Sequence, residues 1–528
     1  MEHKKSSEKS ETDGVEAWMN SFDLADDEMV KHQIYERQQH LQELDDLYLD
    51  VLSPPFQSCE DEMMRLIGIK CKDTEVIEPK KSRAGASPSE SFQVLRKYSR
   101  RRHLRDDSDK ISDMARASFS IEKTIKLAAG KLICAVSEGS NELYNEESSK
   151  EVQLVQNLLS CAENVAKKQH ERAIRFLNAC GEMSSATGTP IQRLAFYLSE
   201  ALSLKIANED REKKQHEKKK LVVRHLEPTK CVNSIPIYFK QFPVTQITNL
   251  VGSHTILHYL DKARRIHIVD LEIRSGVQWV QFMQDASAPS EHPIQHLKIT
   301  AVGTSSKKSI LEETGRQLAS FAESVSLKFT FGVVVVEDVL ELNQDLFELD
   351  ADEAVVVYAA YSLVTMVGRA DRLNHVMEVI KSLRPCIMVV TEMEANCNSP
   401  SFTERFVESL FMFGALFDSL AECLKGEETS RMDIESTLFR SSINNVLAAE
   451  GDEMMLRHVP IHVWRASFDG FGVLETELSF SSLEQANLLL RDFSYGSSIT
   501  LCRNGGCLTV GWKGTPLTSL SAWKLPKH

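Results

Sequence analysis

Acidic side chains at the ends of apolar runs are the first candidates for chemistry in this sequence. Asp270 ends the run IHIVD, and Glu337, Glu392 and Glu394 lie at the ends of two later runs of strand length. Carboxylates at the carboxyl ends of parallel strands can act as general acid and base, or can hold a ligand. No spacing in the sequence brings these carboxylates to one place. The pattern therefore favours a function other than catalysis.

The turn after the first apolar run lacks the residues of a cofactor-binding loop. Between Asp270 and Gly276 it holds one glycine, where a dinucleotide fingerprint needs two or three. The second run ends in Ala301–Thr304, with no acid that could bind a ribose. We therefore expect no cofactor, and we expect Asp270 to cap a helix or bind a backbone amide. For His267, inside the first run, a buried and hydrogen-bonded imidazole is favoured over a base or a metal ligand.

Motifs of the common enzyme and metal classes are missing. The sequence holds no GxSxG, HExxH, P-loop or kinase signature. Its eleven cysteines include no CxxC pair and no Cys/His run at zinc spacing. We therefore expect no catalytic residues and no metal site. Reduced, mostly buried thiols in a cytosolic or nuclear protein are the simplest interpretation.

Five apolar runs of strand length must position these side chains. Each is followed by a helical pattern of ten or more residues, which predicts a parallel sheet covered on both faces. The runs are Ile266–Ile273, His296–Val302, Leu327–Glu337, Glu353–Ala360 and Cys386–Met393. Near the C-terminus, Ile499–Val510 predicts a hairpin with an Asn504-Gly505 turn. The fold class is therefore α/β, a Rossmann-like, methyltransferase-type, mostly parallel sheet with an antiparallel C-terminal hairpin.

Helices precede the sheet. From Glu151 to Ala207 the apolar residues recur at helical spacing, and Gly188 and Pro190 interrupt them, so we expect at least two amphipathic helices. They predict an α-helical cap at about 151–250, followed by an α/β core at about 251–528. Within the first helix, Leu154, Leu158 and Leu159 form an LxxxLL run, which is one residue longer than the LxxLL motif of helices that bind a partner's groove, and leucines at such spacing more often form a core.

Residues 1–150 differ from the rest and predict a mostly disordered acidic arm. From Leu41 to Met64, acids alternate with leucines, which is typical either of an activation segment that folds on a partner or of a solvated helix that docks on its own domain. A basic cluster follows and predicts a nuclear import signal, with a solvated charge run or a phosphate-binding arm as the alternatives. Its residues are Arg96, Lys97, Arg100, Arg101, Arg102 and Arg105. A second basic run, Arg211–Lys220, is better explained as an exposed helix end or loop.

The charge of the whole chain limits its partners. With 62 basic and 76 acidic residues among 528, the net charge is −14, which does not suit a protein that coats nucleic acid. The first thirty residues hold no apolar signal region, and no stretch reaches ~18 uninterrupted apolar residues. We therefore expect no secretion and no membrane span.

Several motifs in a fixed order resemble those of the plant GRAS family. Ile266, His267, Ile268, Val269 and Asp270, followed by Gly276–Trp279, are similar to the family's VHIID motif. The closing residues resemble its SAW motif. They are Trp512, Ser521, Ala522 and Trp523. Between these two motifs and before them, further segments are similar to the two leucine-rich regions, to the PFYRE block and to the segment after it. These segments are Glu151–Ala207, Leu311–Phe321, Pro400–Phe406 and Arg440–Gly451.

The resemblance implies a plant nuclear regulator of transcription. Its partners would be other GRAS proteins, in a homo- or heterodimer, and DNA-binding transcription factors, with DNA contacted mainly through them. Two alternatives remain open, a methyltransferase-like or other small-molecule-binding enzyme and a direct DNA binder. The direct binder would need a basic groove made from Arg264, Arg265, Lys298, Lys307 and Lys308. The chain departs from the family at Asp452–Arg457, and its arm holds neither the DELLA nor the TVHYNP signature.

Overall fold

The computed structural model describes residues 146–213 and 237–526, apart from 239, 261 and 289–291, together with six residues between 121 and 128. The acidic run Leu41–Met64 and the basic cluster Arg96–Arg105 lie outside the described residues, as does most of Arg211–Lys220. No helix within the described ranges is long and apolar enough to cross a membrane.

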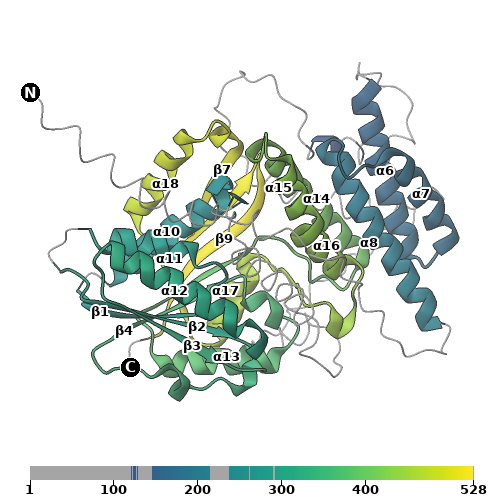
Figure 1. The fold of residues 1–528 in the computed structure, drawn as a ribbon. Coiled ribbons are helices and arrows are strands. Elements are labelled where there is room, and N and C mark those ends of the chain that lie inside the picture. The colour runs from purple at the N-terminus through teal and green to yellow at the C-terminus, as the bar shows by residue number, and fades with distance from the viewer. Residues whose placement is uncertain are drawn as a thin grey trace, which may run out of the picture.

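A single sheet forms the centre of the described part (Figure 1). Its strand order is β3-β2-β1-β4-β5-β9-β8-β7, and the short β6 pairs with β9 beside this path. The parallel strands are β1 (Arg265–Asp270), β2 (His296–Gly303), β3 (Phe329–Val335), β4 (Ala354–Ala360) and β5 (Ile387–Met393). The antiparallel strands are β6 (Leu474–Thr476), β7 (Ile499–Asn504), β8 (Cys507–Trp512) and β9 (Thr515–Lys524). The predicted fold class is confirmed.

Successive side chains of a strand point to opposite faces of the sheet, and apolar residues on both faces explain why helices cover both. In β1, Ile266 and Ile268 join the core on one face of the sheet, while Val269 joins the core on the other. The first core includes residues of α10 (Pro243–Tyr259), α11 (Val277–Ala286), α12 (Lys308–Ser324) and α14 (Phe402–Cys423), and α18 (Phe480–Asp492) packs on α10. The second includes α13 (Ala370–Leu383) and α17 (Ile461–Gly470). The strands are buried on both sides, as their continuous apolar runs predict.

The structure differs from the prediction after the third strand. We expected a helix of ten or more residues there, and instead the chain forms two 3₁₀ turns, η2 (Val339–Glu341) and η3 (Gln344–Phe347). The side chain of Asp338 accepts a hydrogen bond from the backbone N–H of Leu340, and that of Asn343 from the N–H of Asp345. Such local bonds compete with helix formation and end each turn early.

The C-terminal hairpin is present, but its turn is one residue later than predicted. Asn504 pairs with Cys507, so Gly505 and Gly506 form the two-residue loop. Of these two glycines only Gly505 has a positive φ, of 61°. A turn of this kind needs the left-handed region at its first central residue alone, and glycine reaches that region without steric cost.

The helical cap is built from two distant parts of the chain. We define it as α6 (Glu146–Ala166), α7 (His170–Met183) and α8 (Pro190–Lys213), with α14, α15 (Glu428–Ile434), the π-helical turn η5 (Glu435–Phe439) and α16 (Arg440–Leu447). The sequence predicted only the first part. The second could not be foreseen because its contacts are long-range ones.

Buried contacts cross the expected domain limits at two places. Ile121, Ile125 and Ala128 lie before the expected boundary at 151, yet all three are buried in the core of the described part. At the other end, the expected limit of the cap near 250 falls within α10, which packs on α11, α18 and the sheet.

Candidate functional site at the carboxyl ends of the strands

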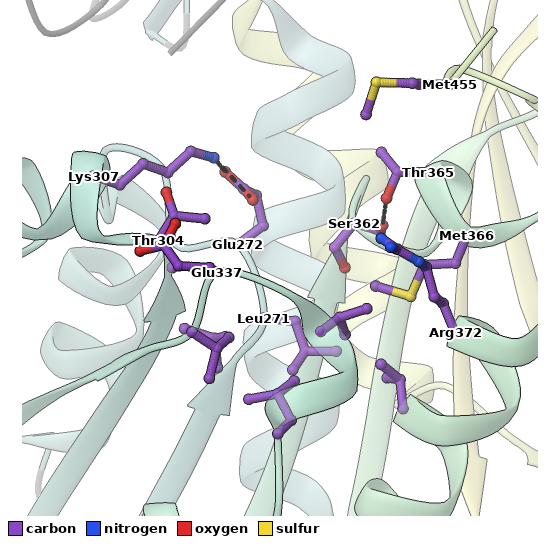
Figure 2. A pocket seen from close by; sticks show the side chains of 16 residues that line it. Leu271, Glu272, Thr304, Lys307, Glu337, Ser362, Thr365, Met366, Arg372 and Met455 are labelled. Carbon is purple, nitrogen blue, oxygen red and sulfur yellow. Dashed lines mark hydrogen bonds and ion pairs between the residues drawn. The ribbon is translucent and has the colours of Figure 1, made fainter. Parts of the chain in front are cut away.

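A pocket of about 180 Å³ lies where the parallel strands end (Figure 2). Leu271 and Glu272, which follow β1, line one side of it, and Ser362 and Met366, which follow β4, line the other. The chain adds strands outward from β1 to β3 and then returns to place β4 on the other side of β1. Open α/β sheets bind ligands at such a switch point. This pocket is therefore the place to test for chemistry.

The charged side chains around the pocket already bond to groups of the same chain. Lys307 Nζ lies 3.0 Å from Glu272 Oε1, an ion pair that Figure 2 shows at the pocket wall. Arg372 donates to Asp338 Oδ2 at 2.7 Å, and Glu337 Oε1 accepts from the backbone N–H of Ser305 at 3.1 Å. Both cations, Lys307 and Arg372, therefore already have a carboxylate partner, and the rest of the lining is largely apolar.

The pocket does not fit S-adenosylmethionine, the cofactor of methyltransferases with this architecture. Its volume of about 180 Å³ is below the ~300–1,000 Å³ of typical ligand pockets. Val302, Gly303 and Thr304 at the end of β2 supply no acid for a ribose, and Lys307 bonds to Glu272 across the space between the first two strands. We derive no catalytic step from this site.

Asp270 is held inside the turn after β1. Its carboxylate is buried and accepts hydrogen bonds from the backbone N–H of Glu272 at 3.0 Å, from Trp279 Nε1 at 2.7 Å and from Gln278 Nε2 at 3.2 Å. The expected bond to a backbone amide is thus present. Burial raises the pKa of Asp270 to about 7, against the opposite effect of these hydrogen bonds. The carboxyl group fastens the turn to α11.

Gly276 ends this turn and cannot be replaced without strain. Its φ is +71°, and a Cβ atom would lie 2.9 Å from Thr314 Cγ2 and 3.2 Å from Leu318 Cδ1 on α12. In the same turn, Arg274 also has a positive φ, and its guanidinium lies 4.9 Å from the ring centre of Tyr361, which follows β4. A side chain therefore stands where a cofactor-binding loop would carry a small residue.

The residues of the VHIID motif form the buried β1 strand. Ile266, Ile268 and Val269 belong to the two cores, and His267 is equally buried. His267 Nε2 lies 2.8 Å from Thr300 Oγ1 on β2. Burial lowers the pKa of His267 to about 4, so its imidazole is neutral at physiological pH. The motif therefore builds the sheet and positions the turn.

The three strand-end glutamates do not share a site. Glu337 lines the pocket, whereas Glu392 is buried and its Oε1 accepts from the backbone N–H groups of Leu363 and Val364 at 3.0 and 3.1 Å. Glu394 Oε2 accepts from the N–H of Ile461 at 3.0 Å. Burial raises the pKa of Glu392 to about 8. These carboxyl groups cap local turns and do not converge on a reacting atom.

The leucines and tryptophans singled out in the sequence are also internal. Leu154, Leu158 and Leu159 are each 1% exposed and pack inside the cap. In the SAW motif, Trp512 Nε1 donates to Asp418 Oδ2 at 2.7 Å, and Trp523 Nε1 to Ser521 Oγ at 2.9 Å. Ala522, which precedes Trp523 in β9, is also buried.

The basic residues considered for a DNA groove are mostly engaged with acceptors of their own chain. Arg265 donates to Asp350 Oδ2 at 2.7 Å, and Lys298 donates to the carbonyl oxygen of Glu348 at 2.7 Å. Lys307 is paired with Glu272, as described above. These cations stabilise the loops around the sheet.

The structure reveals exposed apolar side chains on several elements of the cap, and sequence reasoning missed them. Ile174 of α7 and Phe196 of α8 are 43% and 41% exposed, and Met432 of α15 and Leu438 of η5 are exposed to a similar degree. Arg193 on α8 and Arg431 on α15 both bond to Glu435, which fastens the two parts of the cap together. The helical spacing of the sequence could not separate these side chains from core residues.

Comparison with known proteins decides the family. A model of the GRAS domain family matches residues 154–524. The chain belongs to the GRAS family. It is therefore a member of a family of plant regulators of transcription.

Relatives and a solved structure agree with this assignment. DELLA protein 2 of Medicago truncatula is 29% identical over 388 residues, which cover 72% of this chain and 69% of that protein. DELLA protein GAI1 of Vitis vinifera is 28% identical over 384 residues, which cover 71% of this chain and 62% of that protein. The crystal structure of SCL7 from Oryza sativa has a TM-score of 0.62 and 25% identity, covering 70% of this chain and 99% of that one.

Proposed function

We propose that this GRAS protein is a nuclear regulator of transcription that works as a protein-interaction scaffold and not as an enzyme. The observation that carries the proposal is the contrast between its two surfaces. At the strand ends, where a ligand would bind, Lys307 and Glu272 neutralise each other and the pocket is small. On the cap, by contrast, large apolar side chains face solvent. Exposed apolar side chains of this kind mark contact surfaces with other proteins when they lie together.

The cap surface is our proposed site for a second GRAS protein, and a DNA-binding factor would bring the pair to DNA. Phe196 and Ile174 are its exposed aromatic and aliphatic anchors. Leu154, Leu158 and Leu159 would support binding indirectly, because they hold α6 against the rest of the cap.

Charged substitution at Phe196 tests this proposal. Phe196→Glu should reduce capture of a tagged GRAS protein roughly tenfold or more, because an interface anchor is worth about 2 kcal/mol or more. The readout is pull-down by the purified full chain, with circular dichroism to verify folding. Leu158→Ala is the matched control, since it should lower the free energy of unfolding by about 2–5 kcal/mol instead. Undiminished capture by folded Phe196→Glu would refute the cap surface as the binding site.

The proposed nuclear address is the basic cluster in the arm. Changing Arg100, Arg101 and Arg102 to Ala removes half of the six cations in the cluster and should leave a fluorescent fusion largely in the cytoplasm. The measurement is the ratio of nuclear to cytoplasmic fluorescence in plant cells. A nuclear signal that persists would place the address elsewhere, for example in Lys213–Lys220.

A further inference from the structure

Strand β3 is an open edge of the sheet. Among the described residues it pairs with β2 on one side, and the sheet order ends there. Its run Phe329–Val336 contains no charged residue and no proline. Unpaired edges are usually protected by charges, prolines or bulges, because they otherwise bind further strands. This edge has none of these along eight residues.

Two hydrogen bonds at the ends of β3 show which of its backbone groups face away from β2. Leu297 N–H donates to the carbonyl oxygen of Lys328, and Val336 N–H donates to that of Gly303. Lys328 and Val336, which flank β3, both have even numbers, and successive residues of a strand direct their backbone groups to opposite sides. The outward groups therefore belong to four odd-numbered residues. They are Phe329, Phe331, Val333 and Val335.

Exposed apolar side chains lie on β3 and on the two turns that follow it in the chain. Val335 is 37% exposed, and Leu340 and Leu346 on the following 3₁₀ turns are 43% and 40% exposed. They account for three of the ten large apolar side chains that are exposed in the described part. Backbone donors and acceptors beside exposed apolar side chains are what a strand-pairing surface requires.

We propose that β3 pairs antiparallel with β3 of a second copy of this chain. A register centred on Gly332 places Phe331 opposite Val333 and Phe329 opposite Val335, which uses every outward backbone group. Gly332 then faces its own copy in a non-hydrogen-bonded pair, where two strands approach most closely and a missing side chain costs nothing.

Charge at the two ends of β3 selects this partner and this direction. Lys328 precedes the uncharged run and Glu337 follows it, whereas the next acid, Asp338, is already paired with Arg372. Antiparallel pairing brings the basic end of one strand beside the acidic end of the other. Parallel pairing would set like charges together, which is unfavourable. The edge is therefore complementary to itself in the antiparallel direction.

This interface is separate from the cap surface proposed above. The cap joins the sheet through α14, which contacts β8 and β9, and these strands lie toward the opposite end of the strand order from β3. Figure 1 shows the cap on the right and β3 at the lower left. A chain paired through its cap could therefore pair through β3 as well, and two GRAS dimers would join into a tetramer.

The test uses the full chain with Phe196→Glu, so that the cap surface does not contribute to self-association. Sedimentation velocity over a concentration series should show a monomer–dimer equilibrium. Hydrogen–deuterium exchange of the peptide spanning 327–337 should slow as the dimer forms, because the outward amides become bonded. Val335→Lys should raise the dimer Kd roughly tenfold or more, because it brings a charge into the edge pairing.

Two further variants keep the result decisive. Lys328→Glu makes both ends of β3 acidic without touching a buried group, and it should also weaken the dimer. Leu488→Lys, at a 54% exposed position on α18, is the matched control and should leave the dimer intact. The proposal is overturned if the peptide exchanges at one rate at all concentrations, or if the dimer survives both Val335→Lys and Lys328→Glu. Neither outcome bears on partner capture by the cap.

Discussion

Glu392 shows how burial changes the role of a single carboxyl group. It is 2% exposed, and its Oε1 holds the turn after β4 through two backbone N–H groups, while Oε2 has no hydrogen-bond partner among the described residues. Burial raises its pKa from 4.5 to about 8. Between these two values the unfolded chain has lost the proton and the folded chain keeps it. Stability must therefore fall as pH rises through this window.

Glu392→Gln tests this prediction. Glutamine keeps the accepting oxygen and cannot ionise. As pH rises from 4.5 to about 8, the free energy of unfolding of the variant should therefore increase relative to that of the wild type, by roughly 1–4 kcal/mol at the upper end. Urea unfolding at several pH values measures the difference. Glu378→Gln, at a side chain that is 66% exposed, is the control, and its free energy of unfolding should change with pH in the same way as that of the wild type. Parallel curves for Glu392→Gln would show that Glu392 is already ionised in the folded protein.

At the residue scale, the sequence was enough to assign a structural role to single buried side chains, but not to find the pairs that distant residues form. Asp270 and His267 were expected to be structural, and both are buried with hydrogen-bond partners. The run of apolar neighbours was enough for that inference. By contrast, the ion pair between Lys307 and Glu272 joins residues 35 positions apart, and no local pattern could indicate it.

At the scale of elements, Trp512 connects the antiparallel strands to the cap. It lies on β8, and its indole N–H donates to Asp418 Oδ2 on α14 at 2.7 Å. Trp464 on α17 is equally buried, but its indole N–H has no hydrogen-bond partner among the described residues. Trp512 therefore has an indole hydrogen bond that Trp464 lacks, and the structural contribution of this bond in the SAW region can be measured.

Replacing each tryptophan by phenylalanine separates the hydrogen bond from the packing. Both changes remove a similar buried volume, so the cavity costs should be comparable. Trp512→Phe also leaves a buried carboxylate without one donor, and it should cost about 1–3 kcal/mol more than Trp464→Phe. Equilibrium urea unfolding gives both values. Equal losses would mean that the bond to Asp418 does not stabilise the attachment of β8 to α14.

Strands were easier to predict than the connections between them. Continuous apolar runs flanked by turn residues predicted the five parallel strands to within a few residues, because burial on both faces leaves no other pattern. The connection after β3 was predicted wrongly, since the bonds of Asp338 and Asn343 decide it. The second half of the cap was missed because it depends on contacts such as that between Arg193 and Glu435, 242 residues apart.

At the scale of the whole molecule, the distribution of charge distinguishes a protein that reaches DNA through a partner from one that binds DNA directly. The net charge of the chain is −14. Around the sheet, Arg265, Lys298 and Lys307 already bond to acceptors of the same chain. To bind phosphates, these cations would first have to leave their partners. A DNA-binding factor with its own basic surface would supply the contacts without that cost.

The full chain alone should therefore bind DNA weakly, and its affinity should depend only shallowly on salt. Each phosphate contact adds about 0.9 to the slope of log K against log salt, so we expect a slope of no more than about 2 in fluorescence anisotropy titrations. Arg265→Gln, which removes the donor to Asp350, should leave that slope unchanged. A slope equivalent to ~6–10 contacts, lowered by Arg265→Gln, would instead establish a basic groove. In that case the protein would bind DNA directly, and the cap would join two DNA-binding chains.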